Sequence, residues 1–345
     1  MLQVLPARVS LISPPDFAVL RLTSATKFRF IKVKVSVRGV LRTLMTMPAI
    51  MLQAKTTMFF PREAYYKIGD FTFCLKSPLY TENENLKLFS VQKQEKPDLT
   101  IEITVSPVEL CLPAGVPLIL DDKLIFREGD REIIAVRQYD GKVLFLAKYD
   151  KNKVECTISP RIAENLNTYT VLEIMNLPTF FLNHDSLILH SSFINYNGKA
   201  ILFAAPKQTG KSTQAELWRK YRGAEIINGD RSLIRLTSDG VFAYGLPFCG
   251  TSKICKNEKL PVKGIVLLSQ GKENKIQSPT KREIVLSLMS LCAFENTETE
   301  KLNRFMDLAD KIASHTSFYS LAALPDCSAV ETLEENIEPS QADDK

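Results

Sequence analysis

Residues 199–221 read KAILFAAPKQTGKSTQAELWRKY, and this stretch decides the fold class of the chain. An apolar run typical of a buried strand leads into a glycine-containing loop, and a helical pattern follows the loop. The loop fits the phosphate-binding pattern G-x-x-x-x-G-K-[ST] through Gly210, Lys211 and Ser212, although Ala205 occupies the first glycine position. Strand, loop and helix in this order predict an α/β fold with a nucleotide site.

The expected site for ATP consists of consecutive loop residues. Such a loop works because its backbone N–H groups point inward and the next helix presents its positive end to the anion. Gly210 lets the backbone approach the phosphates, Lys211 neutralises them, and Ser212 offers a hydroxyl ligand to Mg²⁺. Ala205 adds only a methyl group, which is tolerated if its φ stays negative. The predicted ATP-binding residues are Ala205, Pro206, Lys207, Gln208, Thr209, Gly210, Lys211, Ser212 and Thr213.

A carboxylate for the metal and the acceptor follows in the sequence GAEIINGDRSLIRL, residues 223–236. Asp230 ends an apolar run that we expect to form a strand beside the loop strand. Its carboxylate would bind Mg²⁺ together with Ser212, or accept the proton of an attacking hydroxyl. The alternative interpretation of Asp230 is an ordinary turn aspartate.

Two arginines and a histidine are further candidates for the site. Arg231 and Arg235 are cations near Asp230, and one of them would stabilise phosphoryl charge; the alternative is that both are solvated or ion-paired. His190 interrupts the apolar run LILHSSFINY, residues 187–196, which we expect to form the strand before the loop strand. A catalytic-site histidine and a satisfied core histidine remain equal alternatives there.

The net charge of +5 does not favour a nucleic-acid partner. Residues 1–50 carry eight basic residues and one acid, so the remainder has 36 basic and 38 acidic residues, or −2. We expect residues 1–57 to be a poorly structured basic extension, which one interpretation places upstream of a true start at Met51 or Met58. The alternatives are a transit-like or polybasic binding arm and an integral strand or helix. The segment has neither an apolar span nor a secretory signal, so no membrane association is expected.

The cysteine pattern predicts the cellular setting, and the apolar periodicity of the remaining chain predicts its domains. Seven cysteines are scattered singly without a C-x-x-C pair, which favours a reducing, cytoplasmic setting. Residues 58–160 alternate apolar and polar residues, with a hairpin signal at Asp140-Gly141, and predict a mostly antiparallel β domain. Residues 161–337 form the expected nucleotide-binding domain, whose first helical stretch is broken near Pro178. Residues 338–345 are expected to be a mobile tail.

The run LHSSFINYNGKAILFAAPKQTGKSTQAELWRKYRGAEIINGDRSLI, residues 189–234, resembles the core of the HPr kinase/phosphorylase family, which is related to phosphoenolpyruvate carboxykinases. The resemblance covers about residues 180–270. It implies a phosphate-loop kinase core with a mixed sheet that uses ATP and Mg²⁺. By position, His190 matches the family's active-site histidine and the 205–212 run matches its phosphate loop. Asp230 matches one aspartate of an acidic pair that acts as base and acid in phosphoryl transfer to serine.

Two features depart from the family pattern. Gly229-Asp230-Arg231 retains one carboxylate where the family has two. The glutamate-containing signature of HPr kinases is absent from residues 244–264, where glycines and prolines predict a loop in which Thr251, Ser252 and Lys253 could meet phosphate or an acceptor. Glu258 is the nearby candidate for a second metal-site carboxylate.

The sequence therefore predicts an ATP- and Mg²⁺-dependent kinase that phosphorylates a serine or threonine of a small protein or peptide. The resemblance supplies the substrate class, whereas the loop itself indicates only phosphate binding. The alternative from another class is a nucleotide-binding regulatory or assembly protein without transferase activity. A third interpretation, a carboxykinase-like enzyme, lacks a visible cluster for a dicarboxylate. A homo-oligomer is left open.

Overall fold

The computed structural model of the protein describes residues 30–37, 40–48, 62–79, 82–120, 122–129, 131–163, 166–294 and 298–337. The chain divides into two compact units, Met1–Arg62 and Glu63–Lys345. The expected mobile tail at 338–345 and most of the expected basic extension lie outside the described residues. All seven cysteines are free thiols.

The first unit contains a two-stranded antiparallel sheet of β1 (Phe30–Val37) and β2 (Val40–Pro48). This hairpin differs from the poorly structured segment expected there. The reason lies in the sequence, because FIKVKVSV and VLRTLMTM are rich in β-branched residues and partly alternate apolar with polar side chains.

The second unit begins with an eight-stranded sheet. Its strands are β3 (Arg62–Ile68), β4 (Phe71–Ser77), β5 (Leu99–Val105), β6 (Leu118–Leu120), β7 (Lys123–Glu128), β8 (Arg131–Arg137), β9 (Val143–Asp150) and β10 (Lys153–Ile158). They lie in the order β3-β4-β5-β10-β9-β8-β7-β6. The hairpin expected at Asp140-Gly141 is confirmed between β8 and β9. The sheet is mixed rather than simply antiparallel, because β5 pairs in parallel with both β4 and β10.

Short helices pack against this sheet and contribute side chains to its apolar core. They are α1 (Glu84–Lys87), between β4 and β5, and then α2 (Pro160–Ala163), α3 (Thr168–Ile174) and α4 (Leu177–Leu182). The helical stretch expected to break near Pro178 is interrupted after Ile174, and Asn176 adopts the left-handed conformation with φ 44°. Pro178 instead lies in the first turn of α4, where its missing N–H costs nothing.

A ten-stranded sheet occupies the rest of the unit. Its strands are β11 (Ser186–Leu189), β12 (Ser191–Tyr196), β13 (Lys199–Ala204), β14 (Glu225–Asn228), β15 (Ser232–Thr237), β16 (Gly240–Gly245), β17 (Lys259–Gln270), β18 (Lys275–Gln277), β19 (Cys292–Ala293) and β20 (Phe318–Ala323). The main order is β14-β12-β13-β17-β16-β15-β11-β19, and β20 pairs with β17 and β18.

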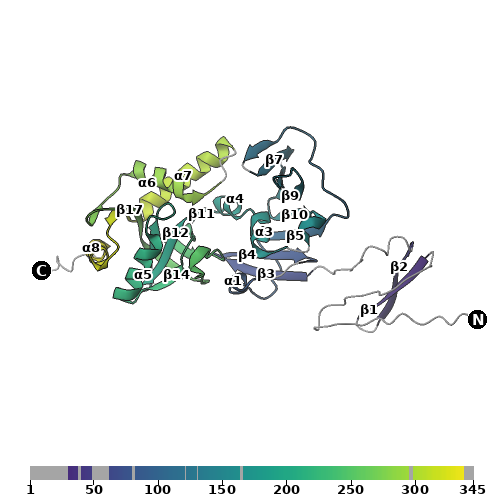
Figure 1. The fold of residues 1–345 in the computed structure, drawn as a ribbon, viewed down its shortest axis with the longest axis horizontal. Coiled ribbons are helices and arrows are strands. Elements are labelled where there is room, and N and C mark those ends of the chain that lie inside the picture. The colour runs from purple at the N-terminus through teal and green to yellow at the C-terminus, as the bar shows by residue number, and fades with distance from the viewer. Residues whose placement is uncertain are drawn as a thin grey trace, which may run out of the picture. The chain divides into compact units, whose positions relative to one another are not determined.

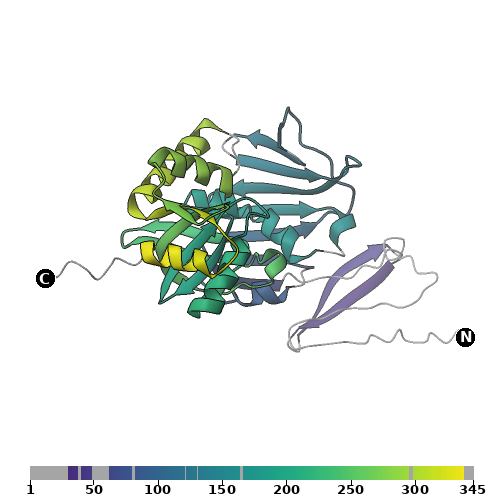
Figure 2. The same cartoon turned by 60° about the vertical axis from the view of Figure 1, so that its left-hand side comes forward.

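Helices cover both faces of this sheet (Figures 1 and 2). They are α5 (Lys211–Arg222), α6 (Lys281–Leu291), α7 (Thr299–His315) and α8 (Cys327–Ile337). Alternate side chains of β13 enter two different apolar clusters, since Phe203 packs with Trp218 of α5 and Leu333 of α8, and Leu202 shares a cluster with Phe305 of α7. This alternation is expected of a strand buried on both faces. Among the described residues, no helix combines the length and apolar character needed to cross a bilayer.

The parallel strands of this sheet determine where its loops meet. β17 pairs in parallel with β13 and with β20. The segments that follow these three strands therefore leave the sheet at the same edge, which is where open α/β sheets bind ligands. One of these segments is the 205–213 loop.

Candidate functional site

The 205–213 loop connects β13 to α5 through two residues of positive φ, Gln208 at 65° and Gly210 at 111°. A Cβ at Gly210 would meet no atom within 4 Å, so its backbone conformation, not lack of space, favours glycine there. Ala205 is not among the residues of positive φ, and its methyl group is buried in the apolar cluster beneath α5. The missing first glycine is therefore accommodated without backbone strain.

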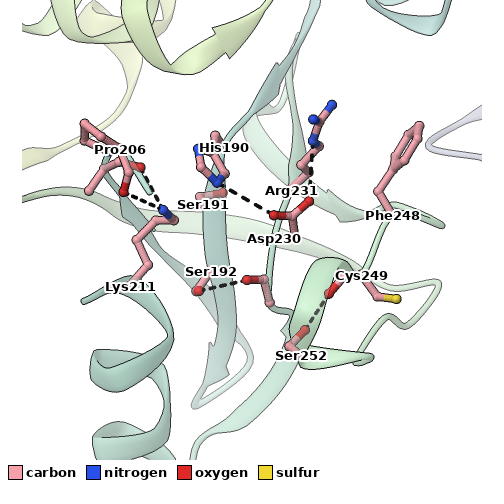
Figure 3. Close-up of polar contacts among 12 residues, drawn as sticks. His190, Ser191, Ser192, Pro206, Lys211, Asp230, Arg231, Phe248, Cys249 and Ser252 are labelled. Atoms are coloured by element: carbon pink, nitrogen blue, oxygen red, sulfur yellow. Dashed lines mark hydrogen bonds and ion pairs between the residues drawn. The ribbon is translucent and has the colours of Figure 1, made fainter. Parts of the chain in front are cut away.

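Lys211, the first residue of α5, folds back over the loop (Figure 3). Its Nζ donates hydrogen bonds to the carbonyl oxygens of Ala205 at 2.8 Å and Pro206 at 2.9 Å. Burial lowers the pKa of Lys211, and Lys207 lowers it further, whereas Asp230 acts to raise it. The ammonium group is thus poorly solvated, which favours exchange of its carbonyl partners for an anion.

A cavity of about 520 Å³ lies against this loop. Its wall is formed by the start of α5 and by the segments that follow β17 and β20, as the parallel pairing requires. The Gln270 amide donates to the carbonyl of Gln208 at 3.2 Å, and the Gln214 amide donates to the carbonyl of Leu324 at 3.0 Å. These bonds join the three segments that surround the cavity. Of the predicted ATP-binding residues, 208–213 line it.

Asp230 lies in the turn between β14 and β15, not at the end of a strand next to β13. β14 pairs with β12, which separates it from β13. The Asp230 carboxylate is 3.7 Å from His190 Nε2 through Oδ1 and 3.4 Å from Arg231 Nε through Oδ2. All three predicted catalytic residues are therefore brought together, and His190 lies between Lys211 and Asp230 in Figure 3.

His190 occupies a break that the sequence pattern did not reveal. The expected single strand is divided into β11 and β12, with His190 between them, and its backbone N–H donates to the carbonyl of Leu291 at 2.9 Å. β11 continues toward β15 and β19, whereas β12 pairs with β13 and β14. Burial lowers the pKa of His190, as do Lys211, Arg231 and Lys207, while Asp230 acts to raise it. A neutral imidazole is thus favoured beside the carboxylate at neutral pH.

Asn228 is a site residue that the sequence interpretation missed. Its side chain is fully buried, and its Oδ1 accepts hydrogen bonds from the backbone N–H groups of Asp230 at 2.9 Å and Arg231 at 3.1 Å. Its Nδ2 donates to the carbonyls of Leu246 at 2.8 Å and Phe248 at 2.9 Å. The available signal was an asparagine at the end of an apolar run immediately before a turn, where such side chains bond to nearby backbone.

The segment 246–258 packs closely against the Asp230 turn. It is irregular except for a short 3₁₀ turn, Gly250–Ser252, and an isolated bridge from Cys255 to Asn228. The loop expected at 244–264 is therefore shorter, because its two ends belong to β16 and β17. A Cβ on Gly250, which has a φ of 52°, would lie 2.9 Å from the carboxylate carbon of Asp230. Ser252 donates to the carbonyl of Cys249 at 2.6 Å, so its hydroxyl is engaged within the segment, whereas Thr251 and Lys253 are exposed.

Arg235 and Glu258 lie apart from this cluster. Arg235 Nη1 is 2.8 Å from Asp70 Oδ2, in the turn between β3 and β4, and its guanidinium stacks 4.4 Å from the Phe71 ring centroid. The ion-paired alternative for Arg235 is therefore correct. Glu258 accepts a hydrogen bond from Gly245 through its backbone carbonyl at 3.0 Å, and no described ion pair or acidic cluster joins its carboxylate to Asp230.

The residues at the site fit Mg²⁺ only as a sparse protein ligand set. No three His, Cys, Asp or Glu side chains gather into a metal-binding group in the part of the chain that is described. Mg²⁺ is usually held by one or two protein oxygens together with waters and phosphate oxygens. The exposed hydroxyl of Ser212 at the cavity and the carboxylate of Asp230 are compatible with that type of coordination.

The chain matches no protein-family model and none of the curated proteins. Among solved structures it is similar to the HPr(Ser) kinase/phosphatase from Coxiella burnetii, with 10% sequence identity and a TM-score of 0.27 over 43% of this chain and 94% of that chain. This is a weak structural resemblance to a protein of the family that the sequence motifs resemble.

Proposed function

We propose that the chain binds ATP with Mg²⁺ at the 205–213 loop of a phosphate-loop kinase core and phosphorylates a serine or threonine of a small protein or peptide. The observation that carries the proposal is the environment of the Lys211 ammonium group. This poorly solvated group bridges two loop carbonyls beside a cavity of about 520 Å³ and lies near the only carboxylate of the Asp230 turn. These observations support an anion-binding site close to a candidate base.

Each side chain would have a role that follows from its position at the site. Lys211 would exchange its carbonyl partners for phosphate oxygens, and the backbone N–H groups at the start of α5 would face the same phosphates. Ser212 and Asp230 would hold Mg²⁺, which supplies charge neutralisation and orientation of the phosphates when bound. His190, favoured in its neutral form, would keep the Asp230 carboxylate facing the reaction centre.

The proposed reaction transfers the γ-phosphoryl group of ATP to the acceptor hydroxyl. The acceptor hydroxyl oxygen forms a bond to the γ-phosphorus while the bond from that phosphorus to the β–γ bridging oxygen breaks, so ADP leaves. The hydroxyl proton passes to the Asp230 carboxylate. A positioned general base typically contributes about 10² to 10⁴ in rate.

A second function is favoured by one specific contact. Arg231 Nε lies 3.4 Å from Asp230 Oδ2, so an arginine, and not a second carboxylate, adjoins the candidate base. The guanidinium would compete with Mg²⁺ for this carboxylate oxygen. The alternative function is thus a nucleotide-binding regulatory or assembly protein without transferase activity.

Nucleotide binding is tested by thermal unfolding with ATP and MgCl₂. A ligand that binds only the native state at a hundredfold excess over its Kd stabilises that state by about 2.7 kcal/mol. We expect Lys211→Ala to lose most of the shift, because its ammonium group is the buried cation of the loop. Lys220→Ala, at an exposed position near the end of α5, should retain the shift. An equal shift in Lys211→Ala and wild type would place the nucleotide elsewhere.

Phosphoryl transfer is tested separately with γ-labelled ATP and a peptide extract. Label on serine or threonine in wild type, and its absence with Lys211→Ala, would support the kinase. An ATP-induced thermal shift without label on any acceptor would favour the regulatory alternative.

A further inference from the structure

Among the described residues, the guanidinium of Arg231 makes a polar contact only through Nε. Its Nε faces Asp230, and its guanidinium lies 5.5 Å from the ring centroid of Phe248. Neither terminal nitrogen has a hydrogen-bond or ion-pair partner among the described residues, and the side chain is 43% exposed. The two terminal NH₂ groups therefore remain available to a ligand.

The guanidinium of Arg231 adjoins Asp230, the candidate base for the acceptor hydroxyl. In Figure 3, Lys211 and His190 lie to the left of Asp230, Arg231 lies above it and Phe248 lies to its right. A phosphoryl group held by Lys211 would approach Asp230 from the loop side. The group next to an acceptor hydroxyl at Asp230 would consequently face Arg231.

The local packing keeps the arginine in this orientation. Asn228 accepts a hydrogen bond from the backbone N–H of Arg231 at 3.1 Å, and it donates to the carbonyl of Phe248 at 2.9 Å. One buried side chain thus anchors the backbone of both Arg231 and Phe248. A guanidinium that is pre-oriented beside an aromatic ring loses less freedom when it binds a planar anion.

We propose that Arg231 and Phe248 form a recognition site for a carboxylate that adjoins the acceptor hydroxyl, so that the preferred acceptor is a serine or threonine next to Asp or Glu in a peptide. Arginine binds carboxylates through two parallel N–H···O bonds, a geometry that lysine does not offer. The carboxylate would occupy the terminal nitrogens, while Nε keeps its contact with Asp230. This inference rests on the proposed function, since it specifies the acceptor of the same site.

The experiment compares peptides that differ at one position. Three peptides with blocked termini would contain a single serine followed by Asp, Asn or Lys. The kcat/KM for phosphorylation would be measured with wild type, and fluorescence anisotropy of labelled versions would give the Kd of each peptide without reference to transfer. We expect the Asp peptide to be favoured over the Asn peptide by about tenfold in both measurements, the usual effect of one charge-assisted contact.

Variants of the arginine identify the group that carries the preference. Arg231→Gln should reduce the Asp-to-Asn ratio to about one, and Arg231→Glu should favour the Lys peptide. Arg231→Lys should retain only part of the preference, because the charge remains but the paired donors are lost. The ratio is taken between two peptides on the same variant, so any effect of the substitution on Asp230 cancels.

Two further variants complete the set. Phe248→Leu should lower the preference, because an aliphatic side chain cannot stack against the guanidinium. Arg219→Gln removes an arginine that pairs with Glu216 on the exposed side of α5, and it should keep the wild-type ratio.

The results separate this inference from the proposed function. If no peptide is phosphorylated but the Asp peptide binds more tightly in an Arg231-dependent manner, the proposed phosphoryl transfer is wrong, whereas the recognition site is supported. Equal ratios for the Asp and Asn peptides in wild type, a preference that survives in Arg231→Gln, or failure of the Asp peptide to bind would overturn the recognition site.

Discussion

The buried side chain of Asn228 holds the turn that carries Asp230. Its Oδ1 accepts the backbone N–H of Asp230 at 2.9 Å, while its Nδ2 donates to two carbonyls of the segment that packs over this turn. One amide therefore sets the backbone position of the candidate base and of its covering segment at the same time.

Replacement of this amide should be costly. Asn228→Ala would leave two backbone N–H groups and two carbonyls without their side-chain partner, so we expect the free energy of unfolding to fall by about 2 to 4 kcal/mol. Urea unfolding measures the loss. Asn195→Ala is the matched control, because that asparagine bonds to a single N–H, of Gly198, in an exposed turn and should cost about 1 kcal/mol or less. Equal losses in the two variants would contradict the assigned role of Asn228.

Asp230→Asn tests the candidate base directly. If this carboxylate accepts the hydroxyl proton, phosphoryl transfer should fall by about 10² to 10⁴ while the affinity for ATP changes only a few-fold. If it mainly holds Mg²⁺, affinity and turnover should fall together. Asp239→Asn, in the turn between β15 and β16, serves as the control. Undiminished transfer in Asp230→Asn would remove this residue from the mechanism and leave His190 as the next candidate base.

Gly250→Ala should perturb the same carboxylate from the covering segment. The added methyl group would lie 2.9 Å from the Asp230 carboxylate carbon, and the φ of 52° disfavours any residue with a Cβ. We expect a loss of about 1 to 2 kcal/mol in stability and a lower rate of transfer, with ATP binding retained. Gly129→Ala has a comparable φ of 63° but meets no atom within 4 Å, so it should lose stability without a selective loss of transfer.

Asp70 should stabilise the fold in a pH-dependent way. Its burial alone would raise its pKa, but hydrogen bonds from Tyr244 and Lys259 and the charge of Arg235 lower the pKa below its usual value. The stabilisation is therefore complete above the unfolded-state pKa, near 4, and is lost as the pH falls through the lower folded-state value. Asp70→Asn would also leave the Arg235 guanidinium without its anion. The Nε of Arg235 is already buried without a hydrogen-bond partner among the described residues.

The expected loss in Asp70→Asn is about 1 to 3 kcal/mol at pH 7, and the difference from wild type should shrink below about pH 4. Urea unfolding at several pH values measures both. A loss that stays constant through that range would show that the carboxylate charge is not responsible.

Local sequence patterns predicted the elements around the loop because their causes are local. The apolar run at β13, the glycine of positive φ and the helical periodicity of α5 act over a few residues, and the structure confirms the strand and the helix at these positions. The Asp140-Gly141 hairpin between β8 and β9 is confirmed for the same reason. Asp230, His190 and Arg231 were identified as candidates by their positions in these runs.

Tertiary structure decided how distant segments meet. The break at His190 follows from the divergence of β11 and β12 toward different partners, which are separated from them by up to about one hundred residues in the chain. The pairing of Arg235 with Asp70 joins residues 165 positions apart, and Asn228 becomes the central donor and acceptor of the site only when segment 246–258 packs against it. Local sequence determines which backbone conformations are favourable, but strand pairing and burial determine which polar groups lose water and must find partners in the protein.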